Sequence, residues 1–191
     1  MSTFANRGLS FESLIEYANS RYRNKSIAVI EKQHTKFIPI RDRRGKIVSC
    51  KVEEKATVDF MGRFGQVPVA FEAKHSSNNR IALDRIQEHQ GDFLTDWTID
   101  KVSGSKQGIG FVLVSFKFDD FYLVPWEYWR AAQKAAKTKK PQKVAFSPMK
   151  TEWQTTGKAS INKDELPDEW RVGLNNSNLL DYLGTVIKLW R

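Results

Sequence analysis

Several features that define common classes of protein are missing from this sequence. Its 191 residues include one cysteine, Cys50, which excludes an intrachain disulfide and a zinc site of several cysteines. No apolar run approaches the roughly 20 residues of a membrane-spanning helix, and the amino terminus lacks the apolar stretch of a secretory signal. The phosphate-loop pattern Gly-x-x-x-x-Gly-Lys-Ser/Thr is also absent. We therefore expect a cytoplasmic protein that uses neither a membrane nor a nucleotide cofactor.

Positive charge is what the sequence has in excess. Lys and Arg number 31 against 22 Asp and Glu, which leaves a formal net charge of +9. Small basic proteins without a membrane segment commonly bind nucleic acid, although a solvated basic surface is the simpler alternative. The charge gathers in blocks that could neutralise several phosphates. The blocks are residues 130–150, which contain no acid; Arg41, Arg43, Arg44 and Lys46; and Arg21, Arg23 and Lys25.

The order of predicted elements favours one α/β domain over residues 1–191. Hydrophobic residues make up 40% of the chain, enough for a core. Apolar residues at helical spacing, with Ser10 as a cap, predict a helix over 10–24. Residues 37–40 and 47–52 flank a basic turn and predict a hairpin. We expect a central mixed sheet flanked by helices. The other predicted helices are 83–97, 126–137 and 179–190, and the other strands are 27–30, 57–60, 67–74, 109–118, 121–124 and 143–146, with turns at 62–65 and 119–120.

A carboxylate and a lysine stand together in the predicted strand 67–74. Strand side chains alternate between faces, so Glu72 and Lys74 point the same way, while Phe71 and Ala73 point to the opposite face. A hairpin with the predicted strand 57–60 would bring Asp59 beside Glu72. An ordinary cross-strand salt bridge would explain these residues equally well.

The same residues suit metal-assisted hydrolysis of a phosphodiester. Two carboxylates are ligands that Mg²⁺ accepts, and Mn²⁺ takes similar oxygen ligands and could substitute. Such a metal lowers the pKa of a bound water and stabilises charge on the phosphate. Lys74 would orient that water or stabilise the charge. Glu12, at the edge of the first helix's apolar face, could reach the metal or its water shell; the alternative is an exposed first-turn glutamate favoured by the helix dipole.

Seven short motifs stand in a fixed order along the chain. They are Asn6-Arg7-Gly8-Leu9-Ser10, Ile27-Ala28-Val29-Ile30, Thr57-Val58-Asp59-Phe60-Met61-Gly62, Phe71-Glu72-Ala73-Lys74, His89-Gln90, Ser160-Ile161-Asn162-Lys163-Asp164-Glu165 and Asp181-Tyr182-Leu183. Together they resemble the RecU-type Holliday junction resolvases of the PD-(D/E)xK nuclease superfamily, and the resemblance runs from about residue 4 to residue 188. Val58 stands where the superfamily name has proline, and the segment matching the stalk is shorter than is typical of bacterial members.

This resemblance implies a fold, an activity and residue roles. It implies a restriction-endonuclease-like core with a protruding basic stalk over residues 37–55. The implied activity is that of a homodimeric, Mg²⁺-dependent endonuclease that cuts four-way DNA junctions by paired nicks in homologous recombination and DNA repair. A dimer suits the symmetric cutting of two strands. By position, Asp59 and Glu72 match the metal-binding carboxylates, Lys74 the catalytic lysine, Thr57 the active-site threonine, Gln90 the glutamine after the core strands, Glu12 the first-helix glutamate and Arg7 an amino-terminal arginine that handles DNA; Arg41, Arg43, Arg44 and Lys46 lie in the stalk.

Two other functions remain open on the sequence. A nuclease core of this kind could act on linear duplex or on other branched DNA. A DNA-binding or annealing protein without catalysis would have the same charge distribution. Comparing cleavage of a four-way junction with cleavage of a duplex of equal length separates these alternatives.

Overall fold

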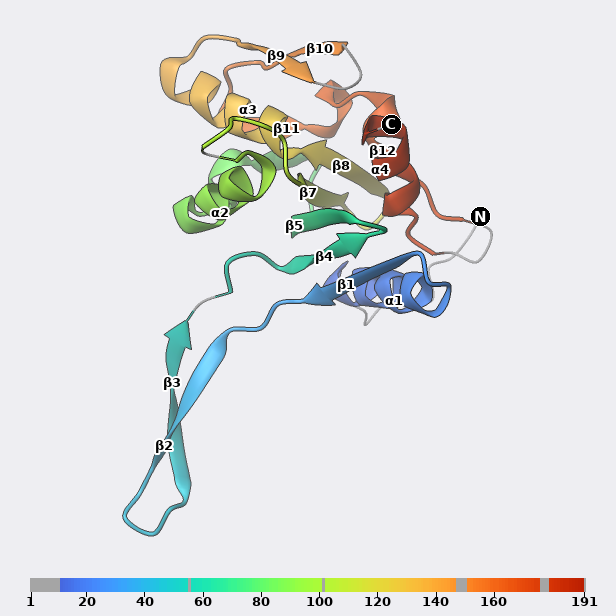
Figure 1. Ribbon diagram of the computed structural model, residues 1–191. Helices are drawn as coiled ribbons and strands as arrows, with labels where there is room; N and C mark the ends of the chain where they lie inside the picture. The colour runs from blue at the N-terminus through green and yellow to red at the C-terminus, as the bar shows by residue number, and fades with distance from the viewer. Residues whose placement is uncertain (1–10, 55, 101, 147–150, 176–178, 191) are drawn as a thin grey trace.

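A six-stranded mixed sheet forms the centre of the molecule (Figure 1). The computed structural model describes residues 11–54, 56–100, 102–146, 151–175 and 179–190. Strands β5 and β7 pair in parallel, and the other neighbouring strands pair antiparallel. The order across the sheet is β1 (Ala28–Lys32), β4 (Phe60–Phe64), β5 (Val67–Ser76), β7 (Ile109–Phe116), β8 (Asp120–Pro125) and β12 (Arg171–Val172).

Four helices cover the sheet: α1 (Phe11–Asn24), α2 (Glu88–Thr98), α3 (Trp126–Thr138) and α4 (Tyr182–Trp190). On one face, Phe71 packs between Phe60 and Phe111 and against Tyr182 of α4, whose ring also meets Tyr22 of α1. The predicted α/β class, the central mixed sheet and its flanking helices are therefore confirmed.

The opposite face lies against α2 and α3. A Cβ atom placed on Gly110 of β7 would lie 2.6 Å from Thr98 Cγ2 and 3.5 Å from Trp126 Cβ, so both helices approach the sheet closely there. Glu72 lies on this face, because it alternates with Phe71 along β5.

The predicted basic hairpin is present and protrudes from the sheet (Figure 1). It consists of β2 (Lys36–Arg41) and β3 (Ile47–Glu54), which pair only with each other. Asp42 closes the tip, where its carboxylate accepts the backbone N–H groups of Arg44 and Lys46 at 2.8 and 3.0 Å. Every residue of β2 is exposed, so the hairpin gains little from the core.

Smaller elements complete the chain. Two-stranded sheets are formed by β6 (Arg80–Ala82) with β11 (Ser160–Asn162), and by β9 (Lys143–Phe146) with β10 (Thr151–Gln154). The 3₁₀ turns are η1 (Leu83–Arg85), η2 (Lys163–Glu165) and η3 (Asp168–Trp170). In the described ranges, no helix combines the length and apolar character required to cross a bilayer.

Several predicted boundaries were wrong. The strand expected at 57–60 begins only at Phe60, so Asp59 precedes β4, and its turn lies at residues 65–66 rather than 62–65. The helix expected over 83–97 is split, because Ile86 is buried in extended conformation between η1 and α2. The turn after β7 spans residues 117–119. The last helix begins at Tyr182 rather than at residue 179. Ser10, the predicted cap, lies outside the described residues.

Candidate active site

Pairing of β4 with β5 brings Asp59 and Glu72 together. Phe60 and Phe71 are register partners, so the next residue outward on each strand is Asp59 on one side and Glu72 on the other. The Asp59 backbone N–H donates to Glu72 Oε1 at 3.1 Å. The Ala73 N–H donates to Asp59 Oδ2 at 2.9 Å. Asp59, the residue just before β4, is therefore linked to β5 by two hydrogen bonds that extend the contact between the two strands by one residue.

Lys74 completes a cluster of three charged side chains. Its Nζ lies 2.6 Å from Glu72 Oε2 and 3.6 Å from Asp59 Oδ2. The Glu72 side chain has no exposed surface, whereas the Asp59 side chain is 27% exposed. The cluster thus opens to solvent at Asp59 and is closed behind Glu72.

The electrostatics of the cluster favour an added cation. Burial is the largest cause that raises the pKa of Glu72, and the Asp59 carboxylate also raises it. Lys74 opposes both effects, and the resulting pKa is about 8. A divalent ion would compensate the charge of the two carboxylates and so lower the pKa of Glu72. The donor set fits such an ion, because Asp59 and Glu72 both aim oxygens at the one point where Lys74 Nζ now lies.

The number of ligands limits which metal would fit. No group of three or more His, Cys, Asp and Glu positioned for a metal occurs in the described part of the chain. A metal held here would take two protein carboxylates and several waters, which is how Mg²⁺ commonly binds. Asp59 and Glu72 are therefore residues that could hold Mg²⁺.

Glu12 lies on α1, beside β1, the strand next to β4. It forms an ion pair that the sequence did not predict. Lys32 Nζ lies 2.9 Å from Glu12 Oε2 and 2.6 Å from Glu16 Oε1. Lys32 is the register partner of Phe60, and the next N–H, that of Gln33, donates to the Asp59 carbonyl oxygen at 2.8 Å. In the sequence, charged residues follow the apolar run 27–30 directly, and this pattern could have singled out Lys32.

Thr57 and Gln90 are placed differently from the three clustered residues. Thr57 is half-buried in the segment that leads to Asp59. Gln90 is half-buried in the first turn of α2, where its side chain accepts the Gln87 N–H at 3.0 Å in a capping box. Among the described residues, no hydrogen bond joins Gln90 to Asp59, Glu72 or Lys74.

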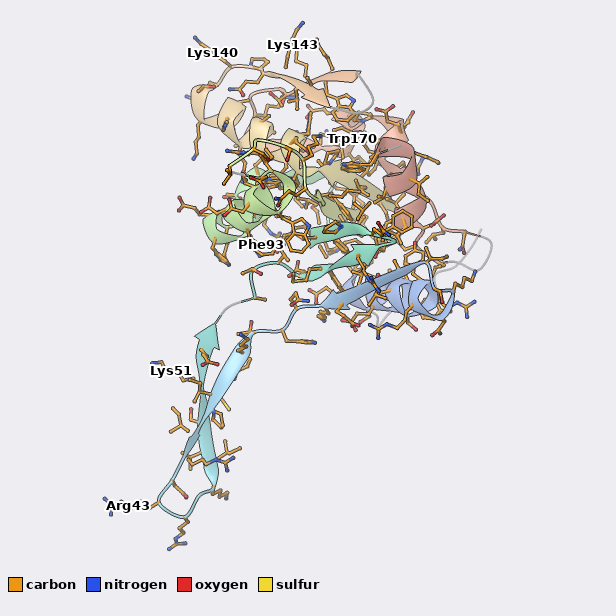
Figure 2. All side chains as sticks on the ribbon, in the orientation of Figure 1. Arg43, Lys51, Phe93, Lys140, Lys143 and Trp170 are labelled. Carbon is orange, nitrogen blue, oxygen red and sulfur yellow. The ribbon has the colours of Figure 1, made fainter. Side chains whose placement is uncertain are left out.

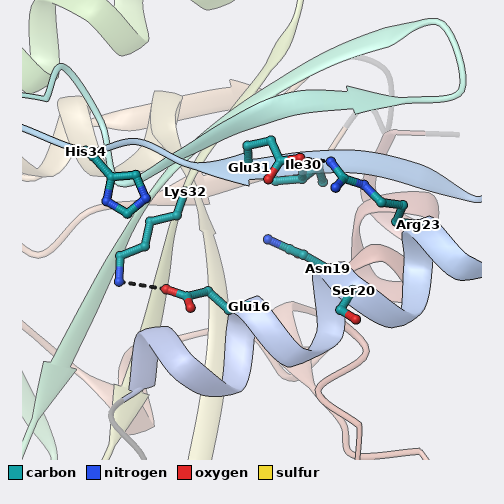
Figure 3. A pocket seen from close by; sticks show the side chains of 8 residues that line it. All are labelled: Glu16, Asn19, Ser20, Arg23, Ile30, Glu31, Lys32 and His34. Carbon is teal, nitrogen blue, oxygen red and sulfur yellow. Dashed lines mark ion pairs between the residues drawn. The ribbon is translucent and has the colours of Figure 1, made fainter.

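A pocket between α1 and β1 was also not predicted (Figure 3). Its charges are paired, since Arg23 contacts Glu31 and Lys32 contacts Glu16. The lining residues are Glu16, Asn19, Ser20, Arg23, Ile30, Glu31, Lys32 and His34.

The predicted DNA-contacting residues lie apart from the cluster. Arg41, Arg43, Arg44 and Lys46 surround the exposed tip of the hairpin, and Figure 2 shows Arg43 pointing into solvent there. Arg41 donates to the Gly45 carbonyl oxygen at 2.9 Å. Arg7 lies outside the described residues.

Fold and site define a mixed α/β protein in which two carboxylates and a lysine converge beside the end of a buried central strand. The family model described as RecU, Recombination protein U, matches residues 6–163. That is more than half of the chain, and the chain therefore belongs to the RecU family. The resemblance noted in the sequence is confirmed.

Similar proteins carry consistent names. The Holliday junction resolvase RecU of Streptococcus pneumoniae is 33% identical over 129 residues, which are 64% of this chain and 62% of that protein. The resolvase of the same name from Streptococcus sanguinis is 32% identical over 133 residues, 65% of this chain and 63% of that protein. The match thus spans less than two thirds of these relatives' length. The solved structure of Hjc, a Holliday junction resolvase from Archaeoglobus fulgidus, has a TM-score of 0.42 and 7% identity over 91% of this chain and 98% of that chain, too low to carry a conclusion.

Proposed function

We propose that this protein is a Mg²⁺-dependent endonuclease that resolves four-way DNA junctions by paired symmetric nicks in recombination and repair. The observation that carries the proposal is the convergence of Asp59, Glu72 and Lys74 in a member of the RecU family. The names of its relatives and the protruding basic hairpin support the choice of substrate.

Asp59 and Glu72 would hold the metal, and Mn²⁺ would substitute for Mg²⁺ because both accept oxygen ligands. When bound, the ion lowers the pKa of a water and stabilises charge on the phosphate. Glu12, which lies on α1 and pairs with Lys32 at the end of β1, would contact the ion's water shell.

The protein's own groups would position the reaction. Lys74, held by Glu72 at 2.6 Å, would orient the attacking water and stabilise the charge that develops on phosphate oxygens. Substrate would enter at Asp59, the exposed member of the cluster. Thr57 and Gln90 would line the approach to it. Arg7 and the tip residues Arg41, Arg43, Arg44 and Lys46 would contact DNA phosphates.

We infer the organisation of the whole protein from the same function. Residues 1–191 would form one restriction-endonuclease-like domain with the hairpin as its excursion. Two copies would form a homodimer, because each site serves one strand of a symmetric pair of cuts. The reaction would take place on cytoplasmic DNA without a nucleotide cofactor.

The test is cleavage of a labelled mobile four-way junction with Mg²⁺, beside a duplex of equal length. The Asp59→Ala and Glu72→Ala variants should lose nicking by at least about 100-fold while they still bind the junction. Asp164→Ala removes an exposed carboxylate from η2 and serves as the matched control, with nicking retained.

Each result has a definite reading. Paired nicks in the junction alone, lost in both site variants, support the proposal. Equal cutting of duplex would leave a nuclease with a different substrate. Binding without cleavage of any DNA, or full activity of the site variants, would overturn the catalytic role of the cluster.

A further inference from the structure

The C-terminal end of α3 carries a second basic surface, distinct from the hairpin. Lys134, Lys137, Lys139 and Lys140 are all exposed, and we call them the α3 lysine surface. We propose that this surface binds the phosphate backbone of a duplex DNA arm that extends away from the candidate active site. The inference rests on the proposed function, which supplies the branched DNA.

The lysines of this surface are not needed to hold α3 in place. The helix is anchored by buried residues on its other side, among them Trp129, Ala132 and Ala135. Lys134 and Lys137 lie three positions apart on the solvent side, so their side chains are neighbours on the helix surface. Their charge is therefore available to a partner rather than to packing.

The charge of this surface is not compensated. In the parts of the chain that the structure describes, no carboxylate forms an ion pair with any of its four lysines. Other surface lysines do have such partners: Lys106 pairs with Glu127, Lys143 with Glu152 and Lys158 with Glu165. Like charges left together at one place repel each other, and a polyanion relieves that repulsion while releasing its counterions.

The backbone that carries Lys139 and Lys140 is held in place by a second segment. Lys139 ends α3 in the left-handed conformation, with φ of 54°, which glycine adopts more readily than lysine. Gly157 packs on the same turn, since a Cβ on it would lie 3.3 Å from backbone atoms of Lys139 and Lys140. The turn is thus held by a second segment, and its lysines are presented at a defined place.

Contacts connect this surface to β5, the strand that carries Glu72 and Lys74. The Gln133 side chain of α3 donates to the Leu83 carbonyl oxygen of η1 at 3.0 Å. The chain reaches η1 directly from β6, and Arg80 of β6 is tied to the end of β5 by the Ser76 hydroxyl at 2.6 Å. Exposed Arg80 and Arg85 lie along this route. DNA that follows it would meet the positive charges of Arg80 and Arg85, with the exposed carboxylate of Asp84 between them.

The position of the α3 lysine surface favours contact with the duplex arms over contact with the centre of the junction. Figure 2 shows Lys140 and Arg43 at opposite ends of the molecule. A compact chain of this length has a radius of gyration of roughly 16 Å. A globule with that radius of gyration is roughly 40 Å across, which DNA spans in roughly ten to twelve base pairs at about 3.4 Å each. Arms of about 20 base pairs therefore extend past the α3 lysine surface, whereas arms of about 6 base pairs cover only about half of that width.

The experiment measures binding to junctions with arms of about 6 or about 20 base pairs, in Ca²⁺ to prevent cleavage, over a range of salt concentrations. In the Lys137→Gln, Lys139→Gln, Lys140→Gln triple variant, affinity for the long-armed junction should fall about tenfold, and the salt dependence of log affinity should weaken by roughly 2 to 3. Affinity for the short-armed junction should change less than about twofold. Thermal melting checks that the variant folds.

The matched control removes the same charge elsewhere, through Arg63→Gln, Lys106→Gln and Lys188→Gln, which are exposed positions outside the three basic blocks. It should lose less than about threefold in affinity for the long arms. Equal losses in the two triple variants, or equal losses for the two arm lengths, would overturn the proposal. Because binding is read without cleavage, failure of the nuclease proposal would appear separately, as absence of nicking by the unaltered protein in Mg²⁺.

Discussion

Glu72 is the residue whose proposed role as a metal ligand lowers the stability of the metal-free fold most directly. Its side chain is fully buried, beside a second carboxylate, with one lysine as its cationic neighbour. Its pKa is raised to about 8, first by burial and then by Asp59. Between its ordinary pKa and this value, the folded protein holds a proton that the unfolded chain has released. Raising the pH through that window therefore destabilises the folded state.

We expect a measurable signature of this conflict in metal-free protein. From about pH 5 to about pH 8, the unaltered protein should lose stability relative to Glu72→Gln by up to about 1.4 kcal/mol per pH unit. Urea unfolding at a series of pH values measures the difference. Mg²⁺ should reduce it at pH 8, because the ion binds the ionised carboxylates. Glu53→Gln, on the exposed hairpin, is the control and should follow the unaltered protein. Parallel curves for Glu72→Gln would contradict the assignment of the raised pKa.

At the scale of elements, the site depends on how β1, β4 and β5 fit together. Gly62 of β4 lies so close to β1 that a Cβ on it would stand 2.0 Å from the Val29 carbonyl oxygen. That neighbour is backbone, which cannot move aside without breaking the pairing of Gly62 with Ile30. The strand β4, which follows Asp59, can therefore pair closely with β1 only because residue 62 is glycine and has no Cβ atom.

Gly62→Ala should destabilise the fold by about 3 kcal/mol, because β1 must separate from β4. Thermal or urea unfolding measures the loss. Gly173→Ala is a matched control, since a Cβ there meets nothing within 4 Å. Similar stabilities for the two variants would show that the β1–β4 contact is looser than the structure indicates.

The hairpin is a separate element and can be removed. Replacing residues 37–53 by Asn-Gly, between the register partners Lys36 and Glu54, should leave stability within about 1 kcal/mol, because β2 is exposed throughout. Under the proposed function, the preference for a four-way junction over duplex should fall about tenfold, since the tip carries Arg41, Arg43, Arg44 and Lys46. Competition binding measures this preference. An unchanged preference would exclude the hairpin from junction recognition.

Local sequence pattern predicted most of these elements for an identifiable reason. The helical spacing of Phe11, Ile15, Ala18 and Tyr22 reports which side of α1 is buried, and the structure agrees. Alternation along 67–74 reports which side chains share a face of β5, although residues 69–73 are all buried because helices cover both faces of the sheet. The same alternation placed Glu72 and Lys74 on one face, and hairpin pairing then fixed Asp59 beside them.

What the sequence could not predict depends on contacts distant in the chain. The pairing of Glu12 with Lys32 needs α1 to lie along β1, and nothing in either segment specifies that. The split before α2 arises because Ile86 is drawn into the core. Gln90 forms a capping box with Gln87 across the start of that shortened helix, a contact that a helix begun at residue 83 would not have needed.

For the whole molecule, the proposed function requires two sites that act together. Each chain carries one Asp59–Glu72–Lys74 cluster in its described part, and symmetric nicks in two strands require two clusters related by a two-fold axis. Sedimentation equilibrium should therefore give a mass near twice the chain's 22.0 kDa.

Mixed dimers test whether each of the two sites cuts one strand of the junction. Subunits with Asp59→Ala and unaltered subunits, carrying different affinity tags, should associate so that about half of the dimers are mixed. Purified mixed dimers should nick one strand of a four-way junction and leave it unresolved, because the partner site lacks a carboxylate for the metal. Mixed dimers of unaltered subunits with Asp164→Ala subunits are the control and should resolve the junction fully. Complete resolution by the Asp59→Ala mixed dimers would mean that one site cuts both strands in turn, and the requirement for a dimer would fall.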